Sequence, residues 1–469
     1  MVRPVLLAAL LLVGCKSDTG PAADKAAKPL ADASCAKAKP HGPLAWFEDD
    51  YASALACAKS RNVPLVLDLW APWCHTCLSM QTTVFTDASF APLADKFVFA
   101  ALDTDRPQNA EVVEKFPLSA WPTFYVIDAE QNVLARFVGA ASLAQFHAFL
   151  DMGANASAGV AGAAKHLLAA ERALAAKDLA TADRELTAAL ATAPADWVRK
   201  PDVLVSLMQT KQKRDDTAGC LALLAASIDD TGNAASATDF IGVALPCVET
   251  QAKTNPGEGH ALRERMITRL QKVLADPASS QSIDDRSDGM IYLRELLISV
   301  DRKDEATALA EQQRQLLEKA AATAPTPVAA MTYNWHLAEV FVFLGRPLEA
   351  VPALEKSAAA LPDEYDPPAR LGWLYLKAGK LDEAATWTER ALALVYGPRK
   401  ARLLGQRAEI AGKQGDTAGE RRYRAEAVAL WESLPPGQAN PAALAAAKAA
   451  LAAISPTGDE PPAVPDASP

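Results

Sequence analysis

A segment near residue 340 repeats 34 residues further on, and this repeat limits the fold of the C-terminal part more than any other feature. The recurring positions carry leucine, an aromatic residue, glycine and a Glu-Ala pair: Leu337, Phe341, Gly345 and Glu349-Ala350 return as Leu371, Tyr375, Gly379 and Glu383-Ala384. Apolar residues at helical spacing on both sides of a glycine predict two helices joined by a tight turn. Because one such pair cannot bury its apolar face alone, we expect a row of pairs that stack into a solenoid.

The best unit reads LGWLYLKAGKLDEAATWTERAL and resembles the tetratricopeptide repeat. The resemblance implies an all-α tetratricopeptide-like solenoid over 161–454, clearest at 334–394, whose surface binds a protein or peptide partner. Weaker units can be placed at four further segments: Ala169–Pro194, Leu207–Ser227, Leu293–Leu309 and Ala408–Leu430. For these weaker units, a generic alanine-rich helical array is the alternative.

The first residues, MVRPVLLAALLLVGC, have the pattern of an export signal. Their apolar run is too short to span a bilayer as a helix, so a signal peptide at 1–14 is predicted. Leu12-Val13-Gly14-Cys15 resembles the lipobox of bacterial lipoproteins, which implies acylation of Cys15 and a membrane anchor on the periplasmic side. Lys16 after the cysteine favours the outer membrane. An ordinary secretory signal is the alternative.

Composition distinguishes three other segments. Residues 15–43 and 455–469 hold few large apolar side chains, so we expect a flexible tether and an acidic, proline-rich disordered tail. Small residues at 153–160 predict a linker. The net charge is −10 and the isoelectric point is about 5.3, with no basic patch for phosphates, so nucleic acid is not an expected partner.

Residues 44–152 alternate between strand and helix patterns. Continuous apolar runs predict buried strands at 63–70, 97–102 and 123–127, and a turn after the last one leads into 133–138 as a hairpin. Helices are expected at 46–60, after Cys77, at 111–116 and at 143–152. The pattern predicts an α/β domain in which a mixed sheet is flanked by helices.

Cys74 and Cys77 lie between a predicted strand and a predicted helix, in VLDLWAPWCHTC. A cysteine at a helix N-terminus is favoured as thiolate by the unpaired N–H groups there, and the two-residue spacer allows a redox-active disulfide. A structural zinc would need further ligands, and a c-type haem would need histidine at position 78, which is leucine. We therefore expect neither metal nor cofactor. A purely structural disulfide is the alternative.

The surrounding residues resemble the thioredoxin superfamily over about 110 residues, and most closely the C-terminal domain of bacterial thiol:disulfide interchange proteins. The resemblance rests on DLWAPWC, on Trp121-Pro122-Thr123 and on the flanks ALACAKSRNVPLVLDLW and TTVFTDASFAPLADKFVFAALDTD. It implies that Asp68 exchanges the proton of Cys77, and that Pro122 follows a cis peptide bond facing the disulfide. The alternatives are a partly exposed carboxylate and a simple strand-start proline.

The direction of electron flow stays open. His75-Thr76 between the cysteines and Leu78 after them depart from ordinary thioredoxins, and a thiolate favoured by His75 makes a disulfide more oxidising. The family resemblance points instead to a reductase.

Four cysteines remain if Cys15 is acylated. Bridges Cys35–Cys57 and Cys220–Cys247 are considered, with a free thiol and a buried small residue as the alternative for the first pair. Four other histidines are isolated in the sequence, so surface or packing roles are expected for His147, His166, His260 and His336.

Two kinds of function are compatible with these features. The first is an exported, membrane-anchored thiol:disulfide oxidoreductase that acts on protein thiols and disulfides and recruits partners through its helical repeats. The second is a non-catalytic scaffold or assembly lipoprotein in which the thioredoxin-like domain is a docking module.

Overall fold

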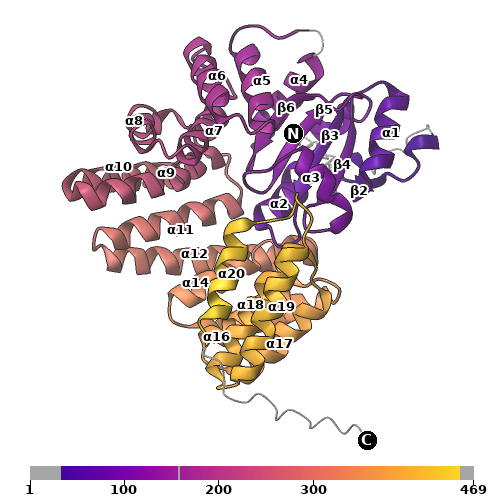
Figure 1. The fold of residues 1–469 in the computed structure, drawn as a ribbon. Helices are drawn as coiled ribbons and strands as arrows, with labels where there is room; N and C mark the ends of the chain where they lie inside the picture. The colour runs from indigo at the N-terminus through magenta and orange to yellow at the C-terminus, as the bar shows by residue number, and fades with distance from the viewer. Residues whose placement is uncertain (1–32, 157–158, 455–469) are drawn as a thin grey trace, which may run out of the picture.

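The computed structural model describes residues 33–156 and 159–454 (Figure 1). The predicted signal peptide, the predicted acylation site Cys15, the expected tether up to residue 32 and the expected tail from residue 455 lie outside the described residues. Among the helices of the described part, none is long and apolar enough to cross a membrane.

A six-stranded mixed sheet forms the core of the N-terminal part, with the strand order β1-β2-β4-β3-β5-β6. Its strands are β1 (Lys39–His41), β2 (Leu44–Glu48), β3 (Leu65–Trp70), β4 (Val98–Asp103), β5 (Thr123–Ile127) and β6 (Val133–Val138). β4 pairs in parallel with β2 and β3, whereas β5 is antiparallel to β3 and β6. The predicted terminal hairpin is therefore present. The central strands are buried on both faces, as their continuous apolar runs predict.

Helices cover both faces of the sheet. α1 (Tyr51–Arg61) and α3 (Ala110–Lys115) share one apolar core with the sheet. On the other face lie α2 (His75–Ser79), which continues as a π-helical turn over Met80–Val84, and α4 (Leu143–Asn155). This second core continues into the first helices of the C-terminal part.

The start of the domain differs from the prediction in two ways. The helix expected over 46–60 begins only at Tyr51, because Leu44–Glu48 pairs with β4 as a strand and Asp50 caps the helix. Residues 33–43, expected in the tether, belong to the fold, because β1 pairs with β2 and Cys35 is bonded to Cys57.

The end of the domain also differs from the prediction. The linker was expected to begin at residue 153, but α4 runs to Asn155 and includes Gly153. A Cβ atom at Gly153 would overlap the side chain of Val126 in β5. The glycine therefore belongs to the packing between helix and sheet, where the missing side chain allows close approach.

The described residues from 159 to 454 form helices and their connections, with no strand. In chain order these are α5 (Gly162–Ala175), α6 (Leu179–Thr192), α7 (Lys200–Lys213), α8 (Thr217–Ser227), α9 (Ala235–Thr254), α10 (Pro256–Ala275), α11 (Ile283–Ser299), α12 (Lys303–Thr323), α13 (Pro327–Met331), α14 (Asn334–Phe343), α15 (Val351–Ala360), α16 (Asp366–Lys377), α17 (Leu381–Leu394), α18 (Gly397–Lys413), α19 (Thr417–Ser433) and α20 (Pro441–Ala452). We call this part the helical array.

The repeat seen in the sequence is a repeated turn in the structure. Gly345 and Gly379 have φ angles of 73° and 72° and end α14 and α16 with the same pair of backbone hydrogen bonds. A residue with positive φ occupies the corresponding turn of the four weaker units: Lys177, Asp215, Asp301 and Gly415. Each of these units is therefore a pair of helices joined by a left-handed turn residue.

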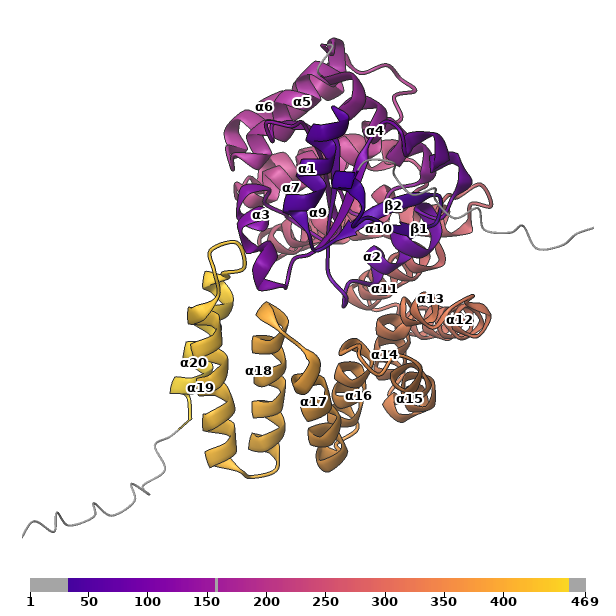
Figure 2. The ribbon, with the colours of Figure 1, turned by 90° about the vertical axis from the view of Figure 1, so that its right-hand side faces the viewer.

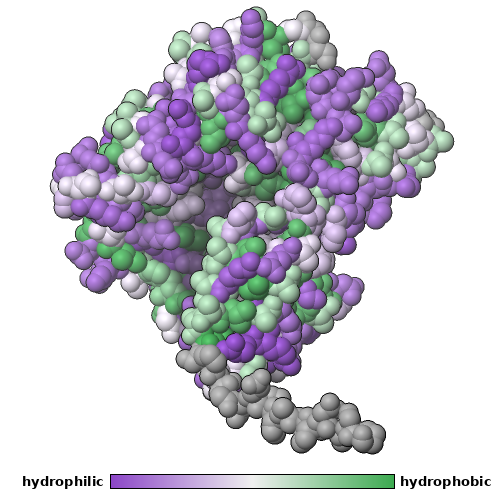
Figure 3. All heavy atoms as spheres, in the orientation of Figure 1, coloured by the Kyte–Doolittle hydropathy of each residue, from purple (hydrophilic) through white to green (hydrophobic). Residues whose placement is uncertain are grey.

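The array curves around the sheet domain. In Figures 1 and 2 it starts beside the sheet with α5 and α6, runs away through α9 and α10, and returns so that α18–α20 end near α3. The return is held by specific contacts, such as the Gln438 side-chain amide donating to the carbonyl oxygen of Thr104 at 2.8 Å. Figure 3 shows the hollow that this curvature leaves between the sheet domain and α20.

Candidate redox centre

Cys74 and Cys77 form a disulfide at the carboxyl end of β3, where α2 begins. Cys74 is the N-cap residue of α2, and the backbone N–H of Cys77 donates to its Sγ at 3.0 Å. In the reduced protein a hydrogen bond of this kind favours thiolate over thiol at Cys74. The local sequence explains why Cys74 lies at the start of α2: the apolar strand ends at Trp70, and Cys74 then serves as the N-cap residue of the helix.

The disulfide is buried. Cys74 and Cys77 are 4% and 1% exposed, and the indoles of Trp70, Trp73 and Trp121 pack around them. The rings of Trp73 and Trp121 meet edge to face, with centroids 5.0 Å apart. A substrate must therefore displace or pass these indoles to reach the sulfur atoms.

Asp68 lies in β3 on the sheet face that α2 covers, because it shares the strand's alternation with Val66. It is 1% exposed, and its Oδ1 has no hydrogen-bond partner. Burial raises the pKa of Asp68 to about 8, opposed by a hydrogen bond with Gln81. A cavity of about 300 Å³ adjoins the carboxyl group, lined also by Gln81 and Arg106. A carboxyl group with this pKa can give and take a proton near neutral pH.

The peptide bond between Trp121 and Pro122 is cis, as the family resemblance implies. Pro122 directly precedes β5, the strand that pairs with β3. Trp121 Nε1 donates to Thr104 Oγ1 at 2.8 Å, which orients the indole beside the disulfide.

The partly exposed side chain of His75 contacts the helical array. Its Nδ1 lies 3.1 Å from both carboxylate oxygens of Asp284 in α11, and His336 Nε2 lies 2.9 Å from Oδ1 of the same carboxylate. Burial opposes the charged imidazole, but the Asp284 and Asp288 carboxylates raise the pKa of His75 to about 9. For Asp284, burial is outweighed by the two histidines, which hold its pKa below the usual value.

Sequence reasoning did not single out Asp284. His336 is buried, which agrees with the packing role expected for it, and it also contacts the Asp284 carboxylate beside the CxxC segment. No local signal links these residues to His75, because Asp284 is 209 positions away from it in the chain.

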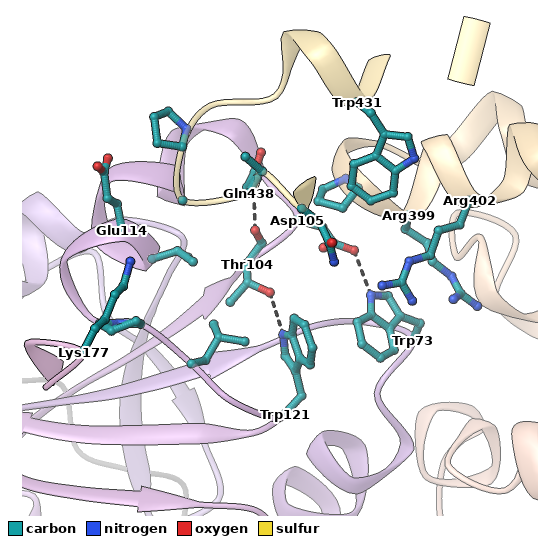
Figure 4. Close-up of a pocket in the computed structure, with 18 residues that line it drawn as sticks. Trp73, Thr104, Asp105, Glu114, Trp121, Lys177, Arg399, Arg402, Trp431 and Gln438 are labelled. Carbon is teal, nitrogen blue, oxygen red and sulfur yellow. Dashed lines mark hydrogen bonds between the residues drawn. The ribbon is translucent and has the colours of Figure 1, made fainter. Parts of the chain in front are cut away.

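A second set of array residues borders the centre (Figure 4). Arg399 lies over the ring of Trp73, 5.5 Å from its centroid, and Trp73 Nε1 donates to Asp105 at 2.8 Å. They line a cavity of about 390 Å³ together with Trp121, Arg402 and Trp431. A second cavity of about 320 Å³ also has Trp121 in its wall, with a different set of array residues: Asp239, Asp285, Asp288 and Tyr292. The array contributes the cationic side chains Arg399 and Arg402 to the first cavity and the carboxylic acids Asp239, Asp285 and Asp288 to the second.

The remaining described cysteines are paired. Cys35 is bonded to Cys57 on α1, and Cys220 on α8 is bonded to Cys247 on α9. Both bonds join neighbouring elements away from the Cys74–Cys77 pair.

Comparison with known proteins identifies the N-terminal domain. A family model described as thioredoxin-like matches residues 46–129. Thioredoxin-1 of Drosophila melanogaster is 30% identical over 92 residues, which cover 79% of that protein and 20% of this chain. The chain belongs to the thioredoxin family. The family membership concerns the sheet domain, which we call the thioredoxin domain.

Other relatives match the same part of the chain. The thiol:disulfide interchange protein DsbD of Vibrio vulnificus is 29% identical over 102 residues, which are 21% of this chain and 17% of that protein. Protein disulfide-isomerase 1 of Dictyostelium discoideum is 29% identical over 84 residues, 18% of this chain and 23% of that protein. The chain therefore spans only about a sixth of the DsbD length.

Solved structures of tetratricopeptide repeat proteins align with larger parts of the chain. One from Parabacteroides merdae covers 62% of this chain and 97% of its own, at 14% identity and a TM-score of 0.40. One from Thermus thermophilus covers 54% of this chain and 98% of its own, at 19% identity and a TM-score of 0.27. The description of the array as helix pairs rests on its own turns, given above.

Proposed function

We propose that this chain is an exported, membrane-anchored thiol:disulfide oxidoreductase of the reductase or interchange type. The observation that supports this most is the arrangement of Cys74 and Cys77: a disulfide at a helix start, with an N–H directed at Cys74 Sγ and the buried Asp68 on the same face of the sheet. The catalytic residues are Cys74, Cys77, Asp68 and Pro122, and the redox-active disulfide takes the place of a cofactor.

In the reductase direction, the Cys74 thiolate attacks one sulfur of a client disulfide. A mixed disulfide forms, and the other client sulfur leaves as a thiolate. Asp68 then accepts the proton of Cys77, whose thiolate attacks Cys74 Sγ and releases the second client sulfur. The client gains two electrons, and the chain is left with the Cys74–Cys77 disulfide. The backbone of Trp121, before the cis proline, pairs with an extended client segment.

The helical array supplies the partner-binding surface in this proposal. Its residues form one wall of each cavity beside Trp121, so a client segment at the disulfide also contacts the array. Export and anchoring rest on the sequence MVRPVLLAALLLVGC, in which Cys15 is the acylated residue. A Cys15→Ala variant is expected to lose the anchor and leave the membrane fraction.

Trapping tests the proposed activity. A Cys77→Ala variant retains the attacking thiol but cannot resolve the mixed disulfide, so it accumulates adducts with exported client proteins. The matched control is Cys74→Ser/Cys77→Ala, which forms no adduct. If the two variants give the same adducts, or none, the oxidoreductase function is wrong. The potential of the couple gives the direction, since about −270 mV is typical of a reductant and about −120 mV of an oxidant.

One observation favours the second candidate, a scaffold with a docking module. Cys74 and Cys77 are almost inaccessible in this conformation, because three indoles pack around them and array residues contact one of these, Trp73. The scaffold function predicts that Cys74→Ser leaves the cellular phenotype unchanged, whereas the oxidoreductase function predicts its loss.

A further inference from the structure

Four side chains from three separate elements converge where the CxxC segment meets the array. They are His75 from α2, Asp284 and Asp288 from α11, and His336 from α14, and their ligand-type atoms all lie within 4.8 Å of one another. The shortest separations join each histidine to the Asp284 carboxylate, at 2.9 and 3.1 Å, and His336 Nε2 lies 3.9 Å from Asp288 Oδ1.

The two imidazoles converge on one point. Nδ1 of His75 and Nε2 of His336 both approach Oδ1 of Asp284, and the two rings stand edge to face with centroids 4.4 Å apart. His336 is fully buried, and its other nitrogen, Nδ1, has no hydrogen-bond partner. This cluster therefore provides the polar contacts of a ring that is otherwise enclosed by protein.

Carboxylic acids outnumber the histidines in this region. Asp239 and Asp285 both lie close enough to Asp288 to interact with it electrostatically. All three residues line the same cavity. A buried excess of carboxylates is costly unless cations balance it. A divalent cation bound among these side chains would supply two positive charges at a single point.

We infer that His75, Asp284, Asp288 and His336 form a binding site for a divalent transition-metal ion of the zinc type, which bridges the thioredoxin domain and the helical array. Two imidazole nitrogens and two carboxylate oxygens are a ligand set that zinc takes in four-coordinate sites. Bonds of about 2.0–2.2 Å place tetrahedral ligand atoms about 3.3 Å apart, so shifts on the order of 1 Å bring these atoms into position. The sequence analysis expected no metal.

The elements position the ligands for local reasons. Ser282 caps α11 and forms a capping box with Asp285, so the first turn of α11 is well defined. Asp284 and Asp288 are four residues apart and therefore lie on one face of this helix. Ser79 Oγ donates to Ser282 Oγ at 3.1 Å, which holds the start of α11 against α2. His75 and Asp288 are partly exposed, at 22% and 30% of their side chains, and give an ion access to the site.

Zinc titration of the oxidised, untagged full-length protein tests the inference. The disulfide keeps the Cys74 and Cys77 thiols from binding the ion, so any tight site belongs to other side chains. After treatment with a chelator, we expect one equivalent of Zn²⁺ in calorimetry, and a zinc-dependent rise in the unfolding midpoint, because ligands that bind the folded state stabilise it. This test is independent of the proposed redox activity.

Two variants and a matched control identify the ligands. Asp288→Asn changes a partly exposed residue, and His336→Gln changes the buried ring; each is expected to weaken zinc binding at least about tenfold. His166→Gln is the control, since His166 also pairs with a carboxylate, Glu185, at 2.8 Å but lies on α5 outside the cluster. No tight zinc site in the oxidised protein, or equal binding by Asp288→Asn, His336→Gln and His166→Gln, would overturn the inference.

Discussion

Arg370 donates a hydrogen bond, at 3.4 Å, to the carbonyl oxygen of Trp73, the residue directly before Cys74. The two residues are 297 positions apart in the chain. The helical array thus touches the segment that carries the disulfide through α16, late in the array. Through this contact and through Arg399 over the Trp73 ring, the array forms a cover on one of the indoles that bury the disulfide.

Loosening the cover is expected to speed reduction of the disulfide. Arg399→Ala removes a cation–π contact worth about 0.5–2 kcal/mol, so reduction of Cys74–Cys77 by dithiothreitol should become about 2- to 30-fold faster. Stopped-flow tryptophan fluorescence measures the rate. Arg390→Ala, which removes a similar contact with Trp387 inside the array, serves as the control. Equal rates for both variants and the parent would mean that the array does not limit access.

Asp68 should make stability depend on pH. Its pKa is raised from 3.8 to about 8 in the folded protein, so between these pH values the unfolded chain has lost a proton that the folded chain keeps. The free energy of unfolding therefore falls as pH rises through this window, by up to about 1.4 kcal/mol per pH unit, and changes no further above it.

Asp68→Asn removes this pH dependence. Its stability relative to the parent should increase steadily from pH 5 to pH 8, measured by chemical denaturation of the oxidised proteins. Asp87→Asn is the control, because its hydrogen bonds with Ser89 lower the pKa of Asp87 and it titrates below this range. A difference between Asp68→Asn and the parent that stays constant across the range would contradict the raised pKa.

The Cys220–Cys247 bond should stabilise the array without taking part in redox chemistry. It closes a loop with a sequence separation of 27, for which chain entropy predicts about 3–4 kcal/mol. The free energy of unfolding of Cys220→Ala/Cys247→Ala, measured with denaturant, should be lower by about this amount. When Cys77→Ala is added to this double variant, client adducts should still accumulate. Unaltered stability of the double variant would show that the bond does not constrain the unfolded chain.

Two glycines of the array should respond oppositely to alanine. Gly379 has a φ of 72° in the turn after α16, so Gly379→Ala should cost about 1–2 kcal/mol. Gly405 lies within α18 with open space where a Cβ would stand, so Gly405→Ala should add up to about 1 kcal/mol. Thermal unfolding of both variants checks the pair, and destabilisation by Gly405→Ala as well would refute the turn-specific argument.

Local patterns predicted much of the fold and part of the site. Buried strands such as Leu65–Trp70 and the turn glycines Gly345 and Gly379 could be recognised because apolar runs and repeats are properties of short segments. The pattern at Trp46 and Phe47 was misassigned to a helix, since its strand character depends on pairing with Phe99 and Ala100 about 50 residues later. Spacing in the sequence cannot distinguish such a strand from the first turn of a helix.

From local patterns alone, a redox-type cysteine pair could be placed between a strand and a helix, with Asp68 before it and Pro122 after it. The return of the array onto Trp73 beside this pair, and the meeting of Asp284 and His336 with His75, are visible in three dimensions alone. The physical reason is that the curvature of a solenoid is the sum of small rotations between successive helix pairs. Each rotation depends on side-chain packing across a seam, so the final position of the array's far end is a property of the whole assembly of helices.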